Sequence, residues 1–416
     1  MIPQIKQRIE QIRRGEVPEG YKNTKGGIVP DEWVEDNLGR YLSEYKKLSN
    51  DIEKYPVYSS SRQGLIPQSQ YYDNREAVET NLGYKIVPNG YVTYRHMSDD
   101  DVFHFNVNNT GVEILVSSEY PVFSSTEKSS LGYIIPMLND TARFRYFCRT
   151  QKMGGTRTRL YYKNLCTYKS VFPPLAEQEK IAEILQTQDK VIELKEKLIE
   201  EKKRQKKALV QQLITGKKRL AGFYDAWKPT ELKKLLKERK TYSQKGLEYP
   251  HVTLSTEGIY AKTERYDREH LVKSEYKEYK ITHKGDICYN PANLKFGVIC
   301  VNTFGDAIFS PIYVTFEVQS GANLGFLSNY LMRWDFINAV RKYEEGTVYE
   351  RMAVKPEDFL KFEIMLPTME EQKAISKLLS LYDWEIDLLK KDLDQEKQKK
   401  KALMQLLLTG IVRIGV

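Results

Sequence analysis

The sequence contains few residues that could hold a metal ion or form disulfide bonds. It includes four cysteines and five histidines. The cysteines, Cys148, Cys166, Cys288 and Cys300, are far apart in the chain, which is typical of buried thiols in a reducing compartment. The histidines show no H-x-x-H or mixed Cys/His ligand spacing. We therefore expect neither disulfides nor a metal site.

The sequence also lacks the segments that direct a chain into a membrane. No apolar run approaches the length of about 20 residues that a membrane-spanning helix needs. The N-terminal stretch MIPQIKQRIEQIRRGE is too charged for a signal peptide. Hydrophobic residues make up 41% of the chain, which is enough for sizeable cores. We expect a cytoplasmic protein of two to three domains.

The motifs of common catalytic sites are absent as well. There is no G-x-x-x-x-G-K-[ST] phosphate loop, no G-x-G-x-x-G cradle after a strand and no G-x-S-x-G elbow. The stretch YNPAN (289–293) lacks the second proline and the aromatic residue of the Asn-Pro-Pro-aromatic motif of amino-methyltransferases, so we interpret it as a loop. We expect a chain that is not an enzyme, with no catalytic residues and no cofactor of its own.

What the sequence does contain is a long internal repeat. KKALVQQLITGKKR (206–219) returns as KKALMQLLLTGIVR (400–413), which gives an offset of 194 in the numbering (400 minus 206). At this offset about 19 of the 48 positions from 173 to 220 are identical to their partners, without a gap. A period of domain size indicates a tandem duplication and not a solenoid.

Both copies of the repeat carry the apolar spacing of a long helix. Each ends at a glycine, Gly216 or Gly410, as helix C-termini often do. Two helices of roughly 40 residues, about 60 Å long, would leave their apolar stripes in water if they stood alone, so we predict an antiparallel coiled coil. The stripe residues, which are also candidates for partner contacts, are Ile181, Leu185, Ile192, Leu209, Leu213, Ile375, Leu379, Ile386, Leu403 and Leu407.

The segments between the helices predict mixed α/β domains. Residues 21–172 and 220–366 contain short β-branched and aromatic runs bounded by Gly, Pro and Asn. Identity between these two segments nearly vanishes at the offset of 194. The framework is therefore repeated, whereas the domains that it flanks have diverged.

The charge balance favours a polyanionic partner. The net charge is +9. The charge runs EEKKRQKK (200–207) and DQEKQKKK (394–401) have two interpretations: a solvated helix face, or groups that lie close to DNA phosphates.

Together these features resemble HsdS, the specificity subunit of type I restriction–modification enzymes. The resemblance covers essentially the whole chain. It rests on FPPLAEQEKIAEIL and LPTMEEQKAISKLL at the start of the helices, KALVQQLITGKKRL and KALMQLLLTGIVRI at their ends, and IVPDEW and FYDAW before the variable domains. The resemblance implies a sequence-specific DNA-binding subunit that reads a bipartite, asymmetric site and directs adenine-N6 methylation and restriction by its partners.

The resemblance also implies the architecture and the partners. We expect an α/β (α+β) tandem repeat with circular pseudo-twofold organisation, in which the helices set the distance between two target recognition domains. The predicted segments are 1–20 (N-terminal helical tip), 21–172 (target recognition domain 1), 173–219 (central spacer helix), 220–366 (target recognition domain 2) and 367–416 (C-terminal spacer helix). The implied partners are double-stranded DNA, two HsdM methyltransferase subunits that use S-adenosylmethionine, and an HsdR motor–nuclease subunit that uses ATP and magnesium.

Base reading needs Arg, Lys, Asn, Gln or similar polar groups on loops that reach a DNA groove. The candidates for DNA contact are Arg62, Gln63, Asn74, Arg75, Arg95, His96, Arg157, Arg159, Lys163, Lys262, Arg265, Asn290, Asn293, Lys295, Arg351 and Lys355. Arg157 and Arg351 align with each other, so they either position phosphates or contact the framework. Trp33 and Trp227 also align, and either anchor the domains on the helices or contact a partner.

One rival interpretation is a coiled-coil scaffold with two protein-binding domains and no role on DNA. Another is an enzyme with an unrecognised nuclease site. Steep salt dependence of duplex binding would favour the DNA-binding interpretation.

Overall fold

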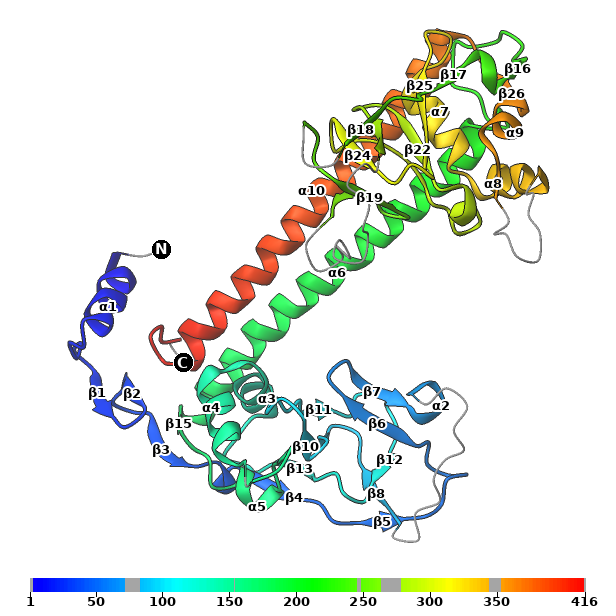
Figure 1. Cartoon of the computed structure of the whole chain (residues 1–416). Helices are drawn as coiled ribbons and strands as arrows, with labels where there is room; N and C mark the ends of the chain where they lie inside the picture. Colours follow the sequence, from blue (N-terminus) through cyan, green and yellow to red (C-terminus); the bar gives the residue numbers. More distant parts are fainter. Residues whose placement is uncertain are drawn as a thin grey trace. The chain divides into compact units, whose positions relative to one another are not determined.

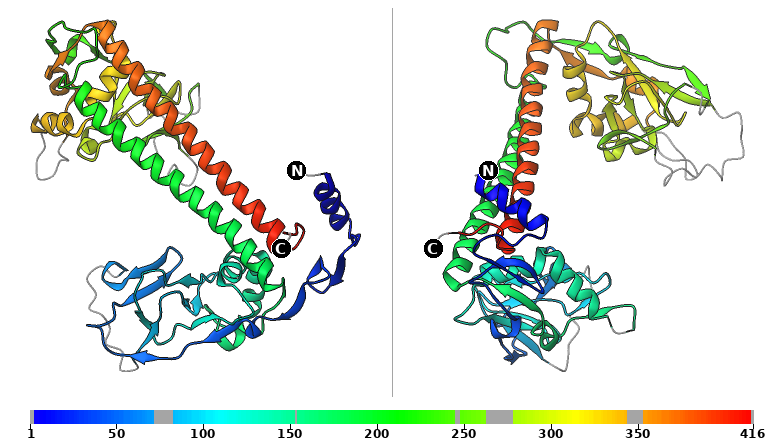
Figure 2. Two further views of the ribbon diagram at one scale, coloured as in Figure 1. Left: turned by 180° about the vertical axis from the view of Figure 1, so that it is seen from behind. Right: turned by 90° about the vertical axis from the view of Figure 1, so that its left-hand side faces the viewer.

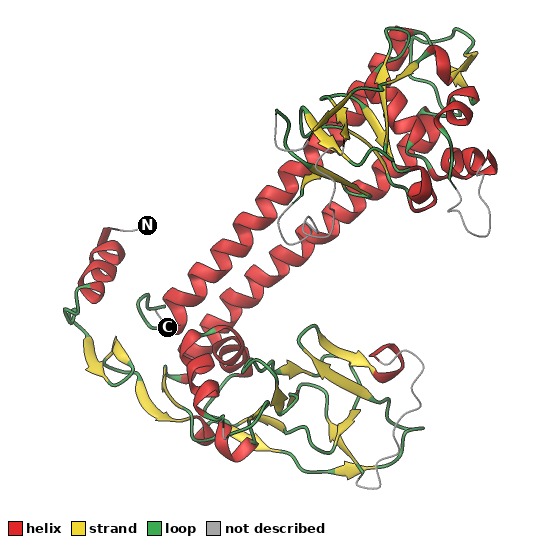
Figure 3. Ribbon diagram, in the orientation of Figure 1, coloured by secondary structure: helices red, strands yellow, loops and turns green. Residues whose placement is uncertain are grey.

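The computed structural model describes residues 3–71, 83–152, 154–244, 248–262, 278–343 and 353–414 (Figures 1 and 3). The chain divides into two compact units. Unit 1 comprises Met1–Glu196 with Asp392–Val416, and unit 2 comprises Lys197–Lys391. The sequence predicted each long helix as a single separate segment, whereas the compact units divide both helices near their middle. The reason is that the two halves of each helix pack on different domains.

Unit 1 contains a mixed α/β domain made of small antiparallel sheets. A four-stranded sheet has the order β11 (Asn106–Val107), β9 (Val92–Thr93), β13 (Val122–Ser125), β4 (Leu42–Glu44). A three-stranded sheet has the order β12 (Ile114–Ser117), β8 (Tyr84–Val87), β5 (Leu48–Ser49). Four strand pairs complete it: β1 (Tyr21–Thr24) with β2 (Gly27–Pro30), β3 (Val34–Asn37) with β15 (Lys169–Phe172), β6 (Tyr58–Ser61) with β7 (Gly64–Pro67), and β10 (Met97–Ser98) with β14 (Thr158–Arg159). Its shorter helices are α1 (Pro3–Arg13), α2 (Gln68–Tyr71), α3 (Leu131–Asp140), α4 (Ala142–Thr150) and α5 (Tyr162–Leu165), with the 3-10 helix η1 (Leu38–Arg40).

The second unit repeats the strand order of the two larger sheets and, within the described residues, two of the four strand pairs. Its four-stranded sheet has the order β17 (Leu236–Glu238), β25 (Val314–Val318), β22 (Ile287–Tyr289), β23 (Ile299–Val301), and its three-stranded sheet β18 (Tyr242–Gln244), β21 (Glu278–Thr282), β24 (Ala307–Phe309). Its strand pairs are β16 (Lys228–Glu231) with β26 (Glu363–Leu366), and β19 (Val252–Ser255) with β20 (Gly258–Ala261). Its shorter helices are α7 (Leu324–Leu331), α8 (Trp334–Val340) and α9 (Pro356–Lys361), with the 3-10 helices η2 (Leu232–Lys234), η5 (Pro291–Phe296) and η6 (Arg341–Tyr343).

Two hydrogen bonds inside the domains show that the same positions are connected in both units. Leu38 N donates to Tyr168 O in unit 1, and Leu232 N donates to Phe362 O in unit 2; the internal repeat aligns the two donors and the two acceptors. The buried Tyr94 Oη donates to a main-chain carbonyl at 3.0 Å, as does the buried Tyr289 Oη. The fold has therefore been kept where sequence identity has nearly vanished.

The two long helices, α6 (Leu175–Leu213) and α10 (Met369–Leu408), lie side by side and antiparallel within each unit (Figure 2). As residue numbers rise along α6, the paired residue numbers fall along α10. The interhelical ion pairs are Lys195–Asp392, Lys397–Glu196 and Lys400–Asp189 in unit 1, and Lys202–Glu385 and Lys206–Asp383 in unit 2. The predicted antiparallel coiled coil is confirmed. Four lysines of the two charge runs pair across the helices, an arrangement that neither interpretation of those runs included.

Glu396 of α10 is a further interhelical carboxylate, and it contacts two side chains of α6. Gln188 Nε2 donates to its Oε2 at 2.7 Å, and Lys195 Nζ lies 3.2 Å from its Oε1. The hydrogen bond from Gln188 and then that from Lys195 lower the pKa of Glu396 to about 2. Exposed ion pairs contribute little each, but this arrangement specifies which residues of the two helices face one another.

Both long helices end as predicted, at a glycine in the left-handed region. Gly216 and Gly410 each have φ of 70°. In each case the main-chain N–H two positions beyond the glycine reaches back into the last turn: Lys218 N to Gln212 O at 3.0 Å and Val412 N to Leu406 O at 3.1 Å. A glycine is favoured there because other residues rarely adopt this conformation.

The helix stripe also enters the domain cores. Ile181 and Leu185 of α6 and Leu407 of α10 belong to the aromatic-rich core of unit 1. Leu213 of α6 and Ile375 of α10 pack in the same way within the second unit. The helix ends are therefore fixed to the domains by buried apolar surface, which contributes roughly 25 cal/mol per Å².

Within the described ranges, no helix is both long and apolar enough to cross a membrane.

Candidate nucleic-acid interface

A buried carboxylate joins the helices to the domain in unit 1. Trp33 Nε1 donates to Glu177 Oε2 at 3.0 Å, and both side chains are fully buried. Arg413 donates from Nε to Glu177 Oε1 at 2.8 Å and from Nη2 to Glu177 Oε2 at 3.1 Å. We call these three residues, Trp33, Glu177 and Arg413, the clasp of unit 1. The clasp links the domain entrance, the start of α6 and the segment after α10.

The second unit contains the same clasp. Trp227 Nε1 donates to Glu371 Oε2 at 3.1 Å. Arg219 donates to both carboxylate oxygens of Glu371, from Nε at 2.6 Å and from Nη2 at 2.7 Å, and its guanidinium lies 5.6 Å from the Trp227 ring centre. Fork-to-fork pairs of this kind are among the stronger and more directional polar contacts in proteins.

A buried glutamine next to each carboxylate fixes the start of a domain helix. Gln178 accepts a hydrogen bond from Ser130 N at 3.0 Å, directly before α3. Gln372 accepts one from Asn323 N at 2.8 Å, directly before α7. The Glu-Gln dipeptide of the repeat therefore attaches equivalent helices of both domains.

The clasp explains much of the internal repeat. Trp33 is fully buried, which leaves no surface for a partner and favours the anchoring interpretation, while Trp227 is partly buried. The arginines of the clasp, Arg219 and Arg413, were missed as site residues, although both lie in the repeat and match at the offset of 194. After Gly410, Ile411 and Val412 stand where the first copy has two lysines, but Arg413 is kept. The segment after α10 therefore docks on unit 1 as the segment after α6 docks on unit 2.

Several predicted DNA-contact residues of unit 1 surround one cleft of about 590 Å³. Arg62 and Gln63 form the exposed tip of the β6–β7 hairpin, and Arg95 lines the same cleft. Arg157 lies outside the cleft lining, is about half exposed and donates from Nε to Asp99 Oδ1 at 2.8 Å. Arg157 therefore contacts an acidic loop of its own domain and not the repeated framework.

The remaining candidates of unit 1 differ in exposure. Arg159 and Lys163 are exposed. His96 is only 2% exposed, and burial lowers the pKa of its imidazole, so the ring is neutral at pH 7. Its polar edge is not available to DNA in this conformation. Asn74 and Arg75 lie outside the described residues.

The candidates of unit 2 are more scattered. Asn290 is 6% exposed and caps η5, because its Oδ1 accepts from Ala292 N at 3.1 Å, which leaves almost no exposed edge for a base. Lys262 follows β20, Asn293 and Lys295 lie on η5, and Lys355 precedes α9. Arg265 and Arg351 lie outside the described residues.

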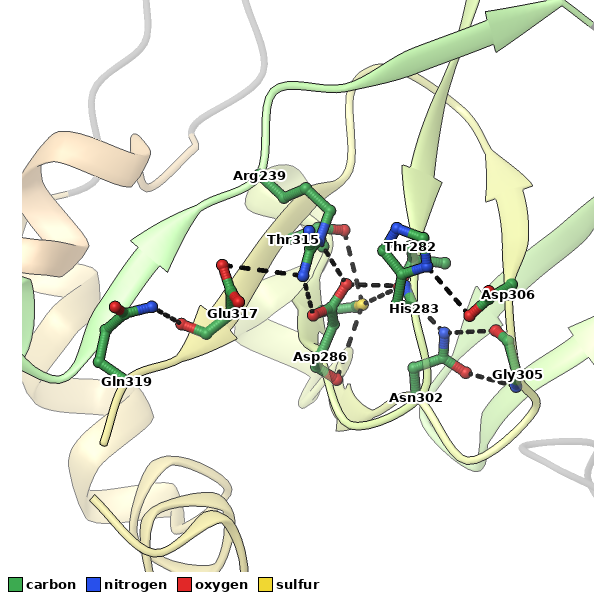
Figure 4. A network of polar contacts seen from close by, with 11 residues as sticks. Arg239, Thr282, His283, Asp286, Asn302, Gly305, Asp306, Thr315, Glu317 and Gln319 are labelled. Carbon is green, nitrogen blue, oxygen red and sulfur yellow. Dashed lines mark hydrogen bonds and ion pairs between the residues drawn. The ribbon is translucent and has the colours of Figure 1, made fainter. Parts of the chain in front are cut away.

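A polar network stabilises the loops of unit 2 (Figure 4). Arg239 donates from Nε and Nη2 to the two oxygens of the buried Asp286 at 3.0 and 3.1 Å. His283 N also donates to Asp286, at 2.7 Å. At the equivalent place in unit 1, Tyr45 and Tyr91 pack edge to face with ring centres 5.2 Å apart. The two domains thus stabilise the same loop junction by different chemistry.

Comparison with known proteins agrees with this geometry. The model of the type I restriction modification DNA specificity domain matches residues 39–204 and 224–397. The type I restriction enzyme MjaVIII specificity subunit of Methanocaldococcus jannaschii is 22% identical, over 95% of this chain and 96% of the relative. The putative MjaX specificity subunit of the same archaeon is 24% identical, over 95% and 97%.

Two solved structures share the fold. One is the type I restriction–modification system S subunit from M. genitalium, with a TM-score of 0.52 and 12% identity over 92% of this chain and 97% of that chain. The other belongs to a study of complex assembly and conformational transition of the type I system, with a TM-score of 0.54 and 12% identity over 92% and 99%. Because the family model covers both domains of this duplicated chain, the chain belongs to the family of DNA specificity subunits of type I restriction–modification enzymes.

Proposed function

We propose that each α/β domain reads one half of a bipartite, asymmetric DNA sequence. The observation that carries the proposal is the pairing of two matching clasps with two domains of unlike surface. Trp33, Glu177 and Arg413 are matched by Trp227, Glu371 and Arg219. Equal frameworks suit two copies of one partner, and unlike surfaces suit two different half-sites.

The partner in this proposal is a methyltransferase subunit, HsdM, bound once to each framework. It would bind S-adenosylmethionine and methylate adenine N6, and an HsdR subunit would supply ATP-dependent movement and cleavage with magnesium. This chain would contribute recognition without catalysis, in the cytoplasm. The net charge of +9 supports a role on a polyanion.

Co-expression with the HsdM subunit tests the proposal. The pair should methylate adenine in one split motif in a host genome, as read by methylation-sensitive sequencing. The purified chain alone, given S-adenosylmethionine, should leave DNA unmodified. Methylation by the isolated chain, or an unsplit motif from the complex, would contradict the proposal.

The spacing of the half-sites provides a sharper test. Lys195 faces Asp392, so four residues inserted after Lys195 and four before Asp392 would lengthen both helices at facing positions. Four residues add about 6 Å and roughly 40° beyond one full turn, so the ion pairs on either side keep nearly the same register. Since each base pair adds about 3.4 Å along the DNA axis, the spacer of unspecified bases between the two half-sites should grow by one or two base pairs.

The control for this test inserts two residues at the same two positions. Two residues rotate each stripe by about 200°, which turns its apolar side away from the partner helix, and methylation should be lost. An unchanged spacer in the four-residue variant would mean that the helices are connectors without a measuring role.

A further inference from the structure

Each domain presents a β-hairpin whose turn is built in the same way. In β6–β7 the turn is Ser61-Arg62-Gln63-Gly64, and Ser61 Oγ donates to Gly64 O at 2.9 Å and accepts from Gln63 N at 3.1 Å. In β19–β20 the corresponding turn begins at Ser255, the residue that the internal repeat aligns with Ser61. Its Oγ makes the same two contacts, at 3.2 and 3.1 Å.

The glycine that closes each turn has a conformation that few other residues adopt. Gly64 has φ of 117° and Gly258 has φ of 131°. The serine hydrogen bonds and the glycine conformation together determine the path of the turn. The side chains of the two residues between serine and glycine take no part in these bonds.

Both hairpins are tied to their domains by the same main-chain contacts. Val57 forms an isolated parallel bridge with Leu115, and His251 forms one with Ile308. The main-chain N–H of the residue after the second strand then donates back to the start of the hairpin. Gln68 N donates to Val57 O in unit 1, and Lys262 N donates to His251 O in unit 2, both at 2.9 Å. The hairpins are therefore equivalent parts of one scaffold.

The two tip residues differ in chemical character between the domains. The first unit has Arg62 and Gln63 at the tip, and the second has Thr256 and Glu257. All four residues are exposed. A basic tip and an acidic tip on the same turn cannot both bind phosphate, because a carboxylate would be repelled by it. They can both accept or donate hydrogen bonds at base edges.

The tip of unit 1 is held in a defined position. Arg62 Nη2 donates to Asp100 Oδ1. Asp100 is itself fixed, since it accepts from Ser98 Oγ at 2.9 Å and from Val102 N at 3.3 Å. A guanidinium has five N–H donors, so this contact aligns Arg62 and leaves donors for another group. Arg62 and Arg95 both line the cleft of unit 1.

We propose that the two hairpin tips read bases, one tip in each half-site. Arg62 donates to the N7 and O6 of a guanine and Gln63 contacts an adjacent adenine, while Glu257 accepts from the N4 amino group of a cytosine in the other half-site. These pairings are the ones that the major-groove edges of the bases favour. The inference rests on the proposed function, since it assumes that the domains read DNA.

The first test substitutes Arg62→Ala in the complex with HsdM. Competition between duplexes that carry every single base-pair change in the motif should show discrimination falling about 5- to 150-fold at one G·C pair in the half-site of unit 1. The matched control is Arg40→Ala, another exposed arginine paired with an aspartate, Asp36, at 2.9 Å. It should leave discrimination unchanged at every position.

The second test grafts the tip of unit 2 onto unit 1 through Arg62→Thr with Gln63→Glu. The shared serine and glycine keep the turn, so the complex should still assemble and methylate, with a changed base preference in one half-motif only. Unchanged discrimination in both variants, or an equal loss at every position, would overturn the inference. Failure of the wild-type complex to methylate any split motif would instead refute the proposed function itself.

Discussion

Replacing Glu177 by glutamine tests the clasp most directly. The carboxylate is fully buried and accepts three hydrogen bonds, one from Trp33 and two from Arg413. Glutamine has almost the same shape, but it carries no charge and turns one acceptor into a donor. At least one of the three N–H groups then loses its partner, and the amide nitrogen faces another donor.

The size of the effect follows from the burial of the partners. Breaking one side of a buried ion pair costs about 3–5 kcal/mol. Here the loss is smaller, because Arg413 keeps about 30% of its side-chain exposure and a contact with Glu32 at 2.6 Å. We expect Glu177→Gln to lower the free energy of unfolding of unit 1 by about 2–3 kcal/mol, or roughly 4–12 °C in Tm for a unit of this size.

Differential scanning calorimetry of the whole chain measures this loss. Glu371→Gln is the matched change in unit 2 and should lower the transition of that unit by a similar amount. Glu179→Gln, at an exposed position of the same helix, is the neutral control. A double-mutant cycle with Trp33→Phe should show coupling, because the indole N–H and the carboxylate are direct partners. A loss for Glu177→Gln no larger than that for Glu179→Gln would refute the reasoning.

Two further predictions concern the helices. The pKa of Glu396 is lowered to about 2 by Gln188 and Lys195, so its contribution is complete above the unfolded pKa near 4.5 and is lost as the pH falls from there to about 2. Urea unfolding of wild type and Glu396→Gln should therefore converge over that range, and parallel pH curves would contradict the assignment. A Cβ added at Gly410 would lie 2.5 Å from the ring of Pro30. Gly410→Ala should therefore lower the free energy of unfolding by an overpacking cost of about 1–3 kcal/mol in addition to roughly 1–2 kcal/mol of left-handed strain. Gly15 has φ of 76°, and a Cβ added there would meet nothing within 4 Å. Thermal unfolding of Gly15→Ala should therefore show the strain alone, and equal stability losses in the two variants would exclude the steric contribution at Gly410.

The elements that depend on neighbouring residues could be predicted from the sequence. The apolar spacing along 175–213 and 369–408 predicts long helices because helical periodicity is a local property. Gly216 and Gly410 mark the helix ends because the left-handed conformation is a property of single residues. The offset of 194 also indicated the duplication, since equal frameworks preserve their residues.

What needed the tertiary structure was the meeting of distant segments. Trp33, Glu177 and Arg413 lie far apart in the chain, and only folding brings the arginine onto the carboxylate. Polarity alone likewise assigned Asn290 to DNA, whereas the fold buries it as a helix cap.

The hairpin tips illustrate both sides of this division. The pattern Ser-x-x-Gly occurs in both domains of the sequence, at 61–64 and 255–258. Its meaning depends on the serine hydrogen bonds and on the bridges that attach each hairpin to its domain. The sequence by itself determined the repeated framework, because that information is local or periodic. The tertiary structure alone decided which polar side chains are exposed, because burial depends on contacts between residues far apart in the chain.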